Sequence, residues 1–259
     1  MQLVLLTAFG VGGATIIGAL IGFTFKNISH KFTDYIMGFA AGVMLSAAVI
    51  GLVLPSLEYG DKPYGVLVTV IGIFCGAFCL NLLDKIIPHL HGSADIECGT
   101  CEGCLPGRNN TEQLDKVLLF VLAIGIHNLP EGIAAGVTFG TGNVADALIV
   151  AGGIALQNIP EGMVIIAPML AIGVKPLRTF AIAASTGVIE VIGTLIGFFA
   201  VNVSLFILPF ALAFAGGTMI YVVSDEMIPE THAHGNERGS TYALLIGFCV
   251  MIAMDYFLG

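Results

Sequence analysis

The stretch HNLPEG at residues 127–132 and its near copy QNIPEG at residues 157–162 decide how this chain folds, because both lie inside long apolar runs. Each copy places a carboxylate, a proline and a carboxamide where a membrane helix normally carries Leu or Val. A charged side chain near the middle of a bilayer costs at least about 2.5 kcal/mol on insertion scales, so it is interpreted first as functional. The two copies are one membrane helix and a short connection apart, which predicts two sequential helices with matching polar sites.

The rest of the composition is that of a membrane protein. Of the 259 residues 57% are hydrophobic and 10% are charged, and the mean hydropathy is +0.97. A soluble domain carries about 25% charged residues. Each span of a bilayer takes roughly 20 helical residues. We therefore expect an all-α membrane protein, a single polytopic transmembrane domain over residues 1–259 with eight transmembrane helices, near residues 2–25, 33–55, 64–86, 116–139, 145–170, 178–201, 205–224 and 240–258.

The basic residues predict the orientation in the membrane. With eight spans, eight of the nine Lys and Arg residues lie in or beside loops on one side, and only Lys62 lies on the other. The positive-inside rule then predicts that these loops are cytoplasmic and that both termini are outside, as in a multi-pass protein of the cell membrane. No basic stripe indicates binding of nucleic acid. The 34 glycines indicate close helix packing in the lipid bilayer and are compatible with a homodimer.

Two segments outside the spans carry metal-binding side chains. The long loop at residues 87–115 is predicted to be a flexible cytoplasmic metal-binding loop, since thiolates and imidazoles suit zinc-like metals; the alternative is an inert linker. The acidic stretch at residues 225–234 is interpreted as an exit or sensing surface, or else as an ordinary solvated loop. The side chains that we expect to capture metal in these two segments are His89, His91, Cys98, Cys101, Cys104, His232 and His234.

The spacing inside the first motif predicts one polar face. On a helix, His127 and Glu131 are four residues apart and Asn128 and Glu131 are three apart, so all three project from the same side. Pro130 is expected to kink the helix and free the carbonyl of Ile126. An imidazole nitrogen, a carboxylate and an amide oxygen together suit a divalent transition metal.

The second motif repeats this geometry with Gln157, Asn158 and Glu161, and the next span adds Glu190. A proline-kinked helix with a hydrogen-bonded Glu is the plain alternative for either motif alone. No buried Lys or Arg is expected beside the three carboxylates to neutralise them, so either they are protonated or a cation sits among them. The membrane potential draws a cation inward by about 2.3 kcal/mol per charge per 100 mV. The residues therefore predict an inward pathway for divalent cations.

Taken together, the two motifs resemble the signature of the ZIP family of zinc and iron transporters. The predicted eight spans, the outside termini and the His-rich loop at residues 87–115 are also similar to those of this family. The runs GFAAGVM at residues 38–44 and DEMIPETH at residues 225–232 are similar to its prokaryotic GufA-like branch. By the residues alone, Met44 in the first run is more simply core filler than a ligand.

The resemblance implies a 3+2+3 bundle in which spans 1–3 and 6–8 form an inverted repeat, with an elevator-like motion. It also implies a two-metal site and uptake of zinc, with iron, manganese and cadmium as further cargoes. Its first metal would be held by Met44, His127, Glu131, Gln157 and Glu161, and its second by Asn128, Asn158 and Glu190 with Glu131 and Glu161 shared. Many members have His in place of Gln157 and some have Asp in place of Asn158, which leaves metal selectivity and the use of the second position open.

Functions other than transport of a metal fit the residues less well. An intramembrane metal-dependent hydrolase needs an open coordination position and a base beside the metal, yet the spans hold only one His and no HExxH pattern. A proton-coupled carrier of a non-metal solute would use the Glu residues as proton relays, and a sensor would bind metal without moving it. We expect no enzyme activity, and no cofactor beyond the transported divalent metal ions.

Overall fold

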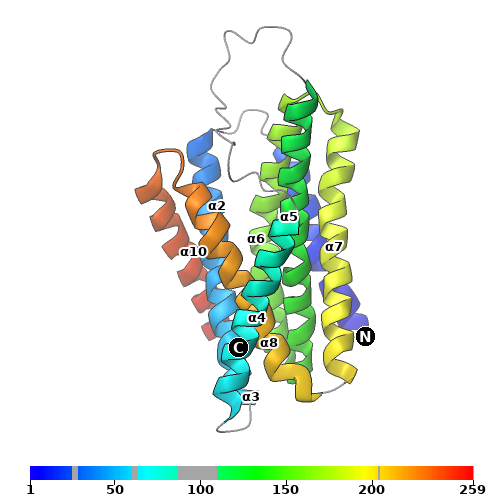
Figure 1. Cartoon of the computed structure of the whole chain (residues 1–259), viewed down its shortest axis with the longest axis vertical. Coiled ribbons are helices and arrows are strands. Elements are labelled where there is room, and N and C mark those ends of the chain that lie inside the picture. Colours follow the sequence, from blue (N-terminus) through cyan, green and yellow to red (C-terminus); the bar gives the residue numbers. More distant parts are fainter. Residues whose placement is uncertain (25–28, 60–63, 87–109, 204, 259) are drawn as a thin grey trace.

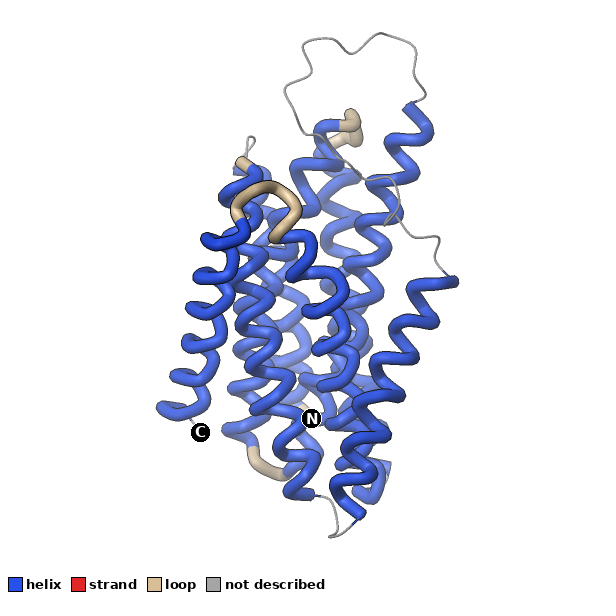
Figure 2. The backbone as a smooth tube through the Cα atoms, turned by 60° about the vertical axis from the view of Figure 1, so that its left-hand side comes forward, coloured by secondary structure: helices blue, strands red, loops and turns tan. Residues whose placement is uncertain are grey.

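The computed structural model describes the whole chain except residues 25–28, 60–63, 87–109, 204 and 259. The described residues form long helices that lie side by side, joined by short connections, with no strand among them (Figures 1 and 2). Both chain termini lie at one end of the bundle, and the α6–α7 and α9–α10 connections lie at the other (Figure 1). This arrangement is what an even number of spans produces.

The helices are α1 (Gln2–Thr24), α2 (His30–Ser46), η1 (Ala47–Val53), α3 (Leu54–Tyr59), α4 (Tyr64–Ile86), α5 (Asn110–Thr138), η2 (Phe139–Thr141), α6 (Val144–Ala171), α7 (Pro176–Val203), η3 (Leu205–Ile207), α8 (Leu208–Val222), η4 (Val223–Met227), α9 (Ile228–Thr231) and α10 (Glu237–Leu258). A tight turn joins the two helices that carry the motifs. Gly142 has a φ of 78°, and Asn143 caps α6 by accepting a 3.0 Å hydrogen bond from the backbone N–H of Ala145. The two motifs therefore lie on adjacent antiparallel helices.

Seven helical segments in the described part of the chain are long and apolar enough to cross a membrane. They match seven of the eight predicted spans, and α5, which carries HNLPEG, is a further long helix that is not among the seven. Several helices extend beyond the predicted limits. The segment α5 begins at Asn110, so residues 110–115 are helical rather than loop. Likewise, η4 and α9 continue the seventh span to Thr231, so most of the acidic stretch that we expected to be a loop is helical.

The second and seventh spans share an irregularity that the sequence did not lead us to expect. Each contains a π-helical segment, η1 or η4, followed by a short α-helix whose second residue is proline, Pro55 or Pro229. A proline ring clashes with the carbonyl four residues before it, and the wider π turn gives that carbonyl room. By contrast, α5 and α6 remain α-helical through Pro130 and Pro160. The π-helical segments therefore lie in the second and seventh spans, and not in the two helices that carry the motifs.

Helix pairing divides the described bundle into two groups of four. The most extensive contacts join α1 to α6, α5 to α7, α2 to α10 and α4 to α8, and α1 also packs along α7. We call α1, α5, α6 and α7 the motif group, and α2, α4, α8 and α10, with the short helices η1, α3, η4 and α9, the outer group. The two groups occupy different sides of the bundle in Figure 1.

Glycines set how closely the helices approach inside each group. A Cβ added at Gly18 of α1 would meet the backbone of Ile159 in α6, and one added at Gly42 of α2 would meet the backbone of Leu244 in α10. Small residues allow this backbone-to-backbone approach between membrane helices. Glycines that face the opposite group meet side chains instead, as Gly51 meets Val150 and Gly153 meets Met251. Packing within a group is therefore closer than packing between the groups.

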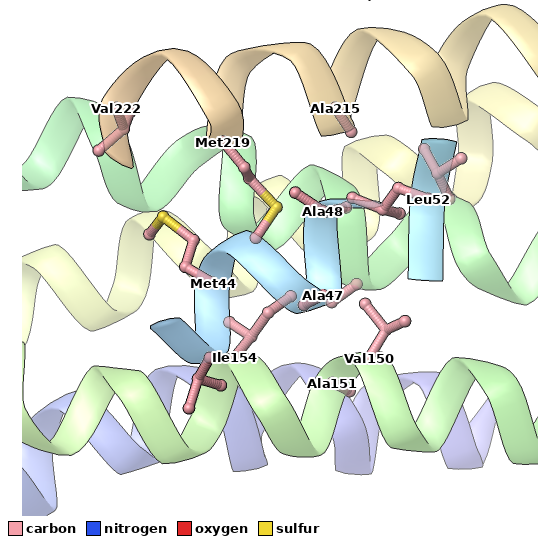
Figure 3. Close-up of a cluster of buried hydrophobic side chains, with 14 of the residues drawn as sticks. Met44, Ala47, Ala48, Leu52, Val150, Ala151, Ile154, Ala215, Met219 and Val222 are labelled. Carbon is pink, nitrogen blue, oxygen red and sulfur yellow. The ribbon is translucent and has the colours of Figure 1, made fainter. Parts of the chain in front are cut away.

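The boundary between the groups is lined by apolar side chains. Figure 3 shows how side chains from α2 and η1 lie between α6 on one side and α8 on the other. The residues of this boundary cluster that are labelled there are Met44, Ala47, Ala48, Leu52, Val150, Ala151, Ile154, Ala215, Met219 and Val222. Small and flexible apolar side chains form a boundary without directional bonds.

Gly18 and Gly13 of α1 offer a matched test of this packing. We expect Gly18→Ala to lower the melting temperature of the purified protein by roughly 3–10 °C, because overpacking costs about 1–3 kcal/mol. A Cβ at Gly13 has nothing within 4 Å, so Gly13→Ala is expected to be neutral or slightly stabilising. Thermal unfolding in detergent followed by size exclusion measures both. Equal melting temperatures for the two variants would contradict the close α1–α6 contact.

Candidate metal centre

The two motifs present buried polar faces, as their spacing predicts. The exposed fraction is 9% for His127 and 6% for Glu161, and the other four polar side chains of the motifs are at most 1% exposed. Glu190 of α7 is also fully buried. Polar groups buried to this extent need partners, either within the protein or from a bound ligand. The partners they have therefore indicate what each residue does.

Glu190 lies at the centre of a hydrogen-bonded cluster. Its Oε1 accepts hydrogen bonds from Asn128 Nδ2 of α5 and from Thr15 Oγ1 of α1, the latter at 2.7 Å. Its Oε2 accepts a hydrogen bond from Asn158 Nδ2 of α6. Both carboxylate oxygens are thus bonded, and all four helices of the motif group meet at this one side chain.

Glu131 is in the opposite situation. Among the described residues, neither of its carboxylate oxygens and neither amide atom of Gln157 has a hydrogen-bond partner, although both residues are at most 1% exposed. The negative charges of Glu161 and Glu190 repel that of Glu131, the amide of Gln157 is close enough to interact with it, and Glu161 is attracted to His127. An unpartnered buried polar group costs about 1–3 kcal/mol, and more if charged. A cation beside Glu131 would remove this cost.

His127 reaches out of the motif group towards η4. Its Nε2 lies 2.9 Å from Oε1 of Glu226, whose side chain is 18% exposed. Sequence reasoning did not include Glu226 among the ligands, because hydropathy predicted that the seventh span ends at residue 224. The sequence signal for the position of Glu226 is Pro229. It lies in the first turn of α9, so the seventh span continues as a helix beyond Glu226.

Met44 of α2 lies outside the polar cluster. It is 1% exposed and belongs to the apolar boundary cluster, where Figure 3 shows it near Ile154 and Val222. The position agrees with the plain interpretation as a core residue and also places a thioether on the outer group beside α6.

The other predicted metal-capturing side chains are only partly described. His89, His91, Cys98, Cys101 and Cys104 lie outside the described residues. His232 Nδ1 lies 2.7 Å from the carbonyl oxygen of Ile228, and its Nε2 lies 3.1 Å from Oγ1 of Thr241. His234 Nδ1 lies 3.0 Å from Oδ1 of the buried Asp34, and its ring stacks on that of His30. Both contacts fasten the α9–α10 connection.

The cluster supplies hard and borderline ligands from several helices: carboxylates, an imidazole and amides. Such ligands on facing helices are a usual way to build a metal site in a bundle. Within the described residues no three His, Cys, Asp or Glu side chains form a ready metal-binding group. A cation held here would therefore also need neutral ligands, and the unpartnered amide of Gln157 is one.

Comparison with known proteins gives the family. The sequence profile described as ZIP Zinc transporter matches residues 106–255, which include both motifs and Glu190. The chain is 36% identical to the zinc transporter GufA of Myxococcus xanthus, over 96% of this chain and 96% of that protein. It is 36% identical to the zinc transporter ZIPB of Bordetella bronchiseptica, over 95% of this chain and 78% of that protein. It is 30% identical to human zinc transporter ZIP11, over 98% and 97%.

These matches extend over nearly the whole chain and include relatives as distant as a human protein. The helical bundle with several apolar spans makes the chain a multi-pass membrane protein. The resemblance first seen in the two motifs is thereby confirmed: the chain belongs to the ZIP zinc transporter family.

Proposed function

We propose that this chain carries divalent transition-metal cations, zinc first and iron, manganese and cadmium as further candidates, across the cell membrane into the cytoplasm. The observation that carries the proposal is Glu131, whose two buried oxygens have no hydrogen-bond partner within the described residues. A buried carboxylate whose oxygens make no hydrogen bond of regular geometry, with only a neutral amide beside it, is suited to a site that a cation enters and leaves. The names of the relatives support zinc as the first cargo.

The first ligands of the cation are Glu131, Gln157 and Glu161, with His127 at the side nearer η4. Met44 can add its thioether from the facing outer group, which supports cadmium as a cargo because soft ligands favour soft metals. Asn128, Asn158 and Glu190 complete the polar cluster, and their mutual hydrogen bonds stabilise the place where the four helices meet.

Glu226 marks the way out of the site. It pairs with His127 and is more exposed than the motif residues, so it can receive a cation that leaves Glu161. The acidic η4 and α9 segment beyond it, with Asp225 and Glu230 exposed, extends this route towards the end of the bundle that carries Lys175, Arg178 and Arg238. The positive-inside rule assigns that end to the cytoplasm, with both termini outside.

We assign the architecture as eight spans in a 3+2+3 arrangement with an inverted repeat. If spans 1–3 exchange with spans 6–8 and span 4 exchanges with span 5, the pair α1–α6 maps onto α7–α5, and α2–α10 maps onto α8–α4. All four pairs are the extensive contacts of the bundle. The exchange also maps the π segment η1 onto η4, and Pro55 onto Pro229. These matches support the repeat.

The transport motion is a sliding of the motif group against the outer group. The close glycine contacts within each group and the apolar boundary between them support two bodies that move as units. The glycines at the close helix contacts, such as Gly18 and Gly42, are occupied within the chain, so a homodimer would use the apolar outer faces of α4 and α10, where Phe74, Phe78 and Tyr256 are exposed.

Uptake of radioactive zinc into proteoliposomes tests the function. Metal-dependent flux above that of empty liposomes, larger with an inside-negative potential, is the expected result. Turnover of a substrate without flux would favour the hydrolase, and flux of protons without metal would favour a carrier of another solute. Saturable binding of zinc with no flux in either direction would favour a sensor. Any of these three results contradicts the proposal.

A further inference from the structure

We propose that Glu190 is a structural anchor rather than a metal ligand, that Thr15 of α1 is a positioning residue for it, and that the intramembrane cluster consequently binds one cation at a time. The proposal rests on the proposed function for the existence of the cargo site, and goes beyond it in separating the roles of the buried carboxylates.

Two buried carboxylates of the cluster, Glu190 and Glu131, differ in their hydrogen bonding. Glu190 is 0% exposed and both of its oxygens accept hydrogen bonds, three in all from Thr15, Asn128 and Asn158. Glu131 is 1% exposed, and neither of its oxygens has a partner within the described residues. A carboxyl group whose two oxygens are already occupied by three donors would lose those hydrogen bonds by binding a cation.

The orientation of the side-chain amides of Asn128 and Asn158 also bears on the binding of a second cation. A carboxylate only accepts hydrogen bonds, so Asn128 and Asn158 must each turn their NH₂ group towards Glu190. An amide nitrogen has no free lone pair and binds metals only through its neighbouring oxygen. The atoms that face Glu190 are therefore donors that repel a cation. The Oδ1 atoms of both amides have no hydrogen-bond partner within the described residues, so they remain able to ligate the first cation, whereas a second cation bound to Glu190 would have to displace the donors that occupy both of its oxygens.

Helix α1 contributes to the hydrogen-bonded cluster around Glu190, although it carries neither motif. Thr15 is 0% exposed and donates its hydroxyl to Glu190 at 2.7 Å. Asn158 Nδ2 also donates to the carbonyl oxygen of Val11, at 3.2 Å. A Cβ on Gly162 would meet the backbone of Thr15, so the backbone of α1 is held close to α6 at this level. Thr15 and Val11 thus fix the orientation of both Glu190 and Asn158.

The charges then set the number of cations. Glu131 and Glu161 balance the charge of one divalent cation, while Glu190 is occupied by its donors. Replacing the amide of Asn158 with a carboxylate would place two acceptor groups against each other where a hydrogen bond now lies. That pair would need a cation between them. The variant Asn158→Asp is therefore expected to gain a second metal position.

The test measures zinc per chain by elemental analysis after equilibrium gel filtration of the purified full-length protein. The parent for all variants carries Cys98, Cys101 and Cys104→Ser and His89 and His91→Ala, so that the long loop does not contribute metal. We expect one zinc in the parent, two in Asn158→Asp, one in Glu190→Gln and none in Glu131→Gln. Two zinc ions in the parent with one in Glu190→Gln would overturn the proposal, as would one zinc in Asn158→Asp.

Thr15 has its own readout. Thr15→Val keeps the shape but removes the hydroxyl, and is expected to weaken zinc affinity about 3- to 10-fold while leaving one zinc per chain. Thr15→Ser is expected to restore the affinity of the parent. If Ser and Val behave alike, the hydroxyl does not position Glu190. A parent that binds no zinc and shows no flux would instead contradict the proposed function, which separates that failure from failure of the anchor.

Discussion

Glu131→Gln is expected to lower zinc flux into proteoliposomes at least about 100-fold, which corresponds to roughly 2.7 kcal/mol of lost cation stabilisation. The substitution keeps the size of the side chain and removes only its charge. Neither oxygen of the buried Glu131 makes a hydrogen bond of regular geometry in the described part of the chain, and the nearby amide of Gln157 is a neutral group, so a metal cation is the partner best suited to stabilise its charge. The loss of flux therefore reports on the cation site itself.

The same variant is expected to be more stable than the parent when metal is absent. Gln can share hydrogen bonds with the neighbouring amide of Gln157, which relieves an unpartnered buried group worth about 1–3 kcal/mol. A rise in melting temperature of roughly 3 °C or more in metal-free buffer, together with lost flux, would separate a functional effect from misfolding. Glu58→Gln, at an exposed carboxylate of α3, is the matched control and should retain flux. Flux of Glu131→Gln above a third of the parent would exclude Glu131 as a central ligand.

Zinc protection adds a check that does not depend on vesicles. A ligand that binds only the folded state stabilises it, so saturating zinc should raise the melting temperature of the parent and of Glu58→Gln. It should leave that of Glu131→Gln unchanged. A zinc-dependent rise of equal size in all three proteins would assign the stabilisation to sites outside the two motifs.

The spacing of residues within each motif predicted which side chains share a helix face. It did not predict contacts that depend on how the helices pair in the folded chain. The i, i+3 and i, i+4 positions of His127, Asn128 and Glu131 are a property of any α-helix, so their shared burial follows from the sequence. Thr15 is a different case, since one hydroxyl in a glycine-rich apolar helix has no periodic signature. Its role depends on the pairing of α1 with α7, which one sequence does not specify.

The predicted end of the seventh span was wrong for a related reason. Hydropathy falls at Ser224, Asp225 and Glu226, and a window average therefore ends the seventh span there. In the structure the backbone continues as a π segment and then as a helix that begins next to Pro229. Charged residues can lie inside a membrane bundle where they have a partner, and Glu226 has one in His127. Averaged hydropathy cannot identify a partner from another helix.

The division into two groups follows from the positions of glycine. Close backbone contacts at Gly18 and Gly162 join α1 to α6, and similar contacts at Gly42 and Gly247 join α2 to α10. Separating such helices would lose these close backbone contacts. At the boundary between the groups, side chains such as Met44 and Met219 are flexible and can repack as they slide. The easiest large motion is thus between the groups.

A disulfide across the boundary is therefore expected to stop transport almost completely. A Cβ at Gly51 of η1 would lie 3.7 Å from the Cβ of Val150 in α6, within the separation of about 3.5–4.5 Å that a disulfide needs. In a background with the six natural cysteines replaced by Ser, the pair Gly51→Cys and Val150→Cys should transport zinc when reduced. Oxidation should lower its flux to that of empty liposomes, and reduction should restore it.

The control pair lies within the outer group, where a Cβ at Gly216 of α8 would be 3.4 Å from the Cβ of Leu52 in η1. Oxidised Gly216→Cys and Leu52→Cys should keep most of its flux, because its two helices move together. Loss of flux in both pairs would mean that η1 must change shape during transport, and would move the hinge into the outer group. Full flux in a completely cross-linked Gly51 and Val150 pair would exclude sliding at this boundary and leave a cation pathway through a fixed bundle. Loss of flux in the first pair alone requires that the cation cross the membrane together with α5 and α6, since those two helices carry Glu131 and Glu161.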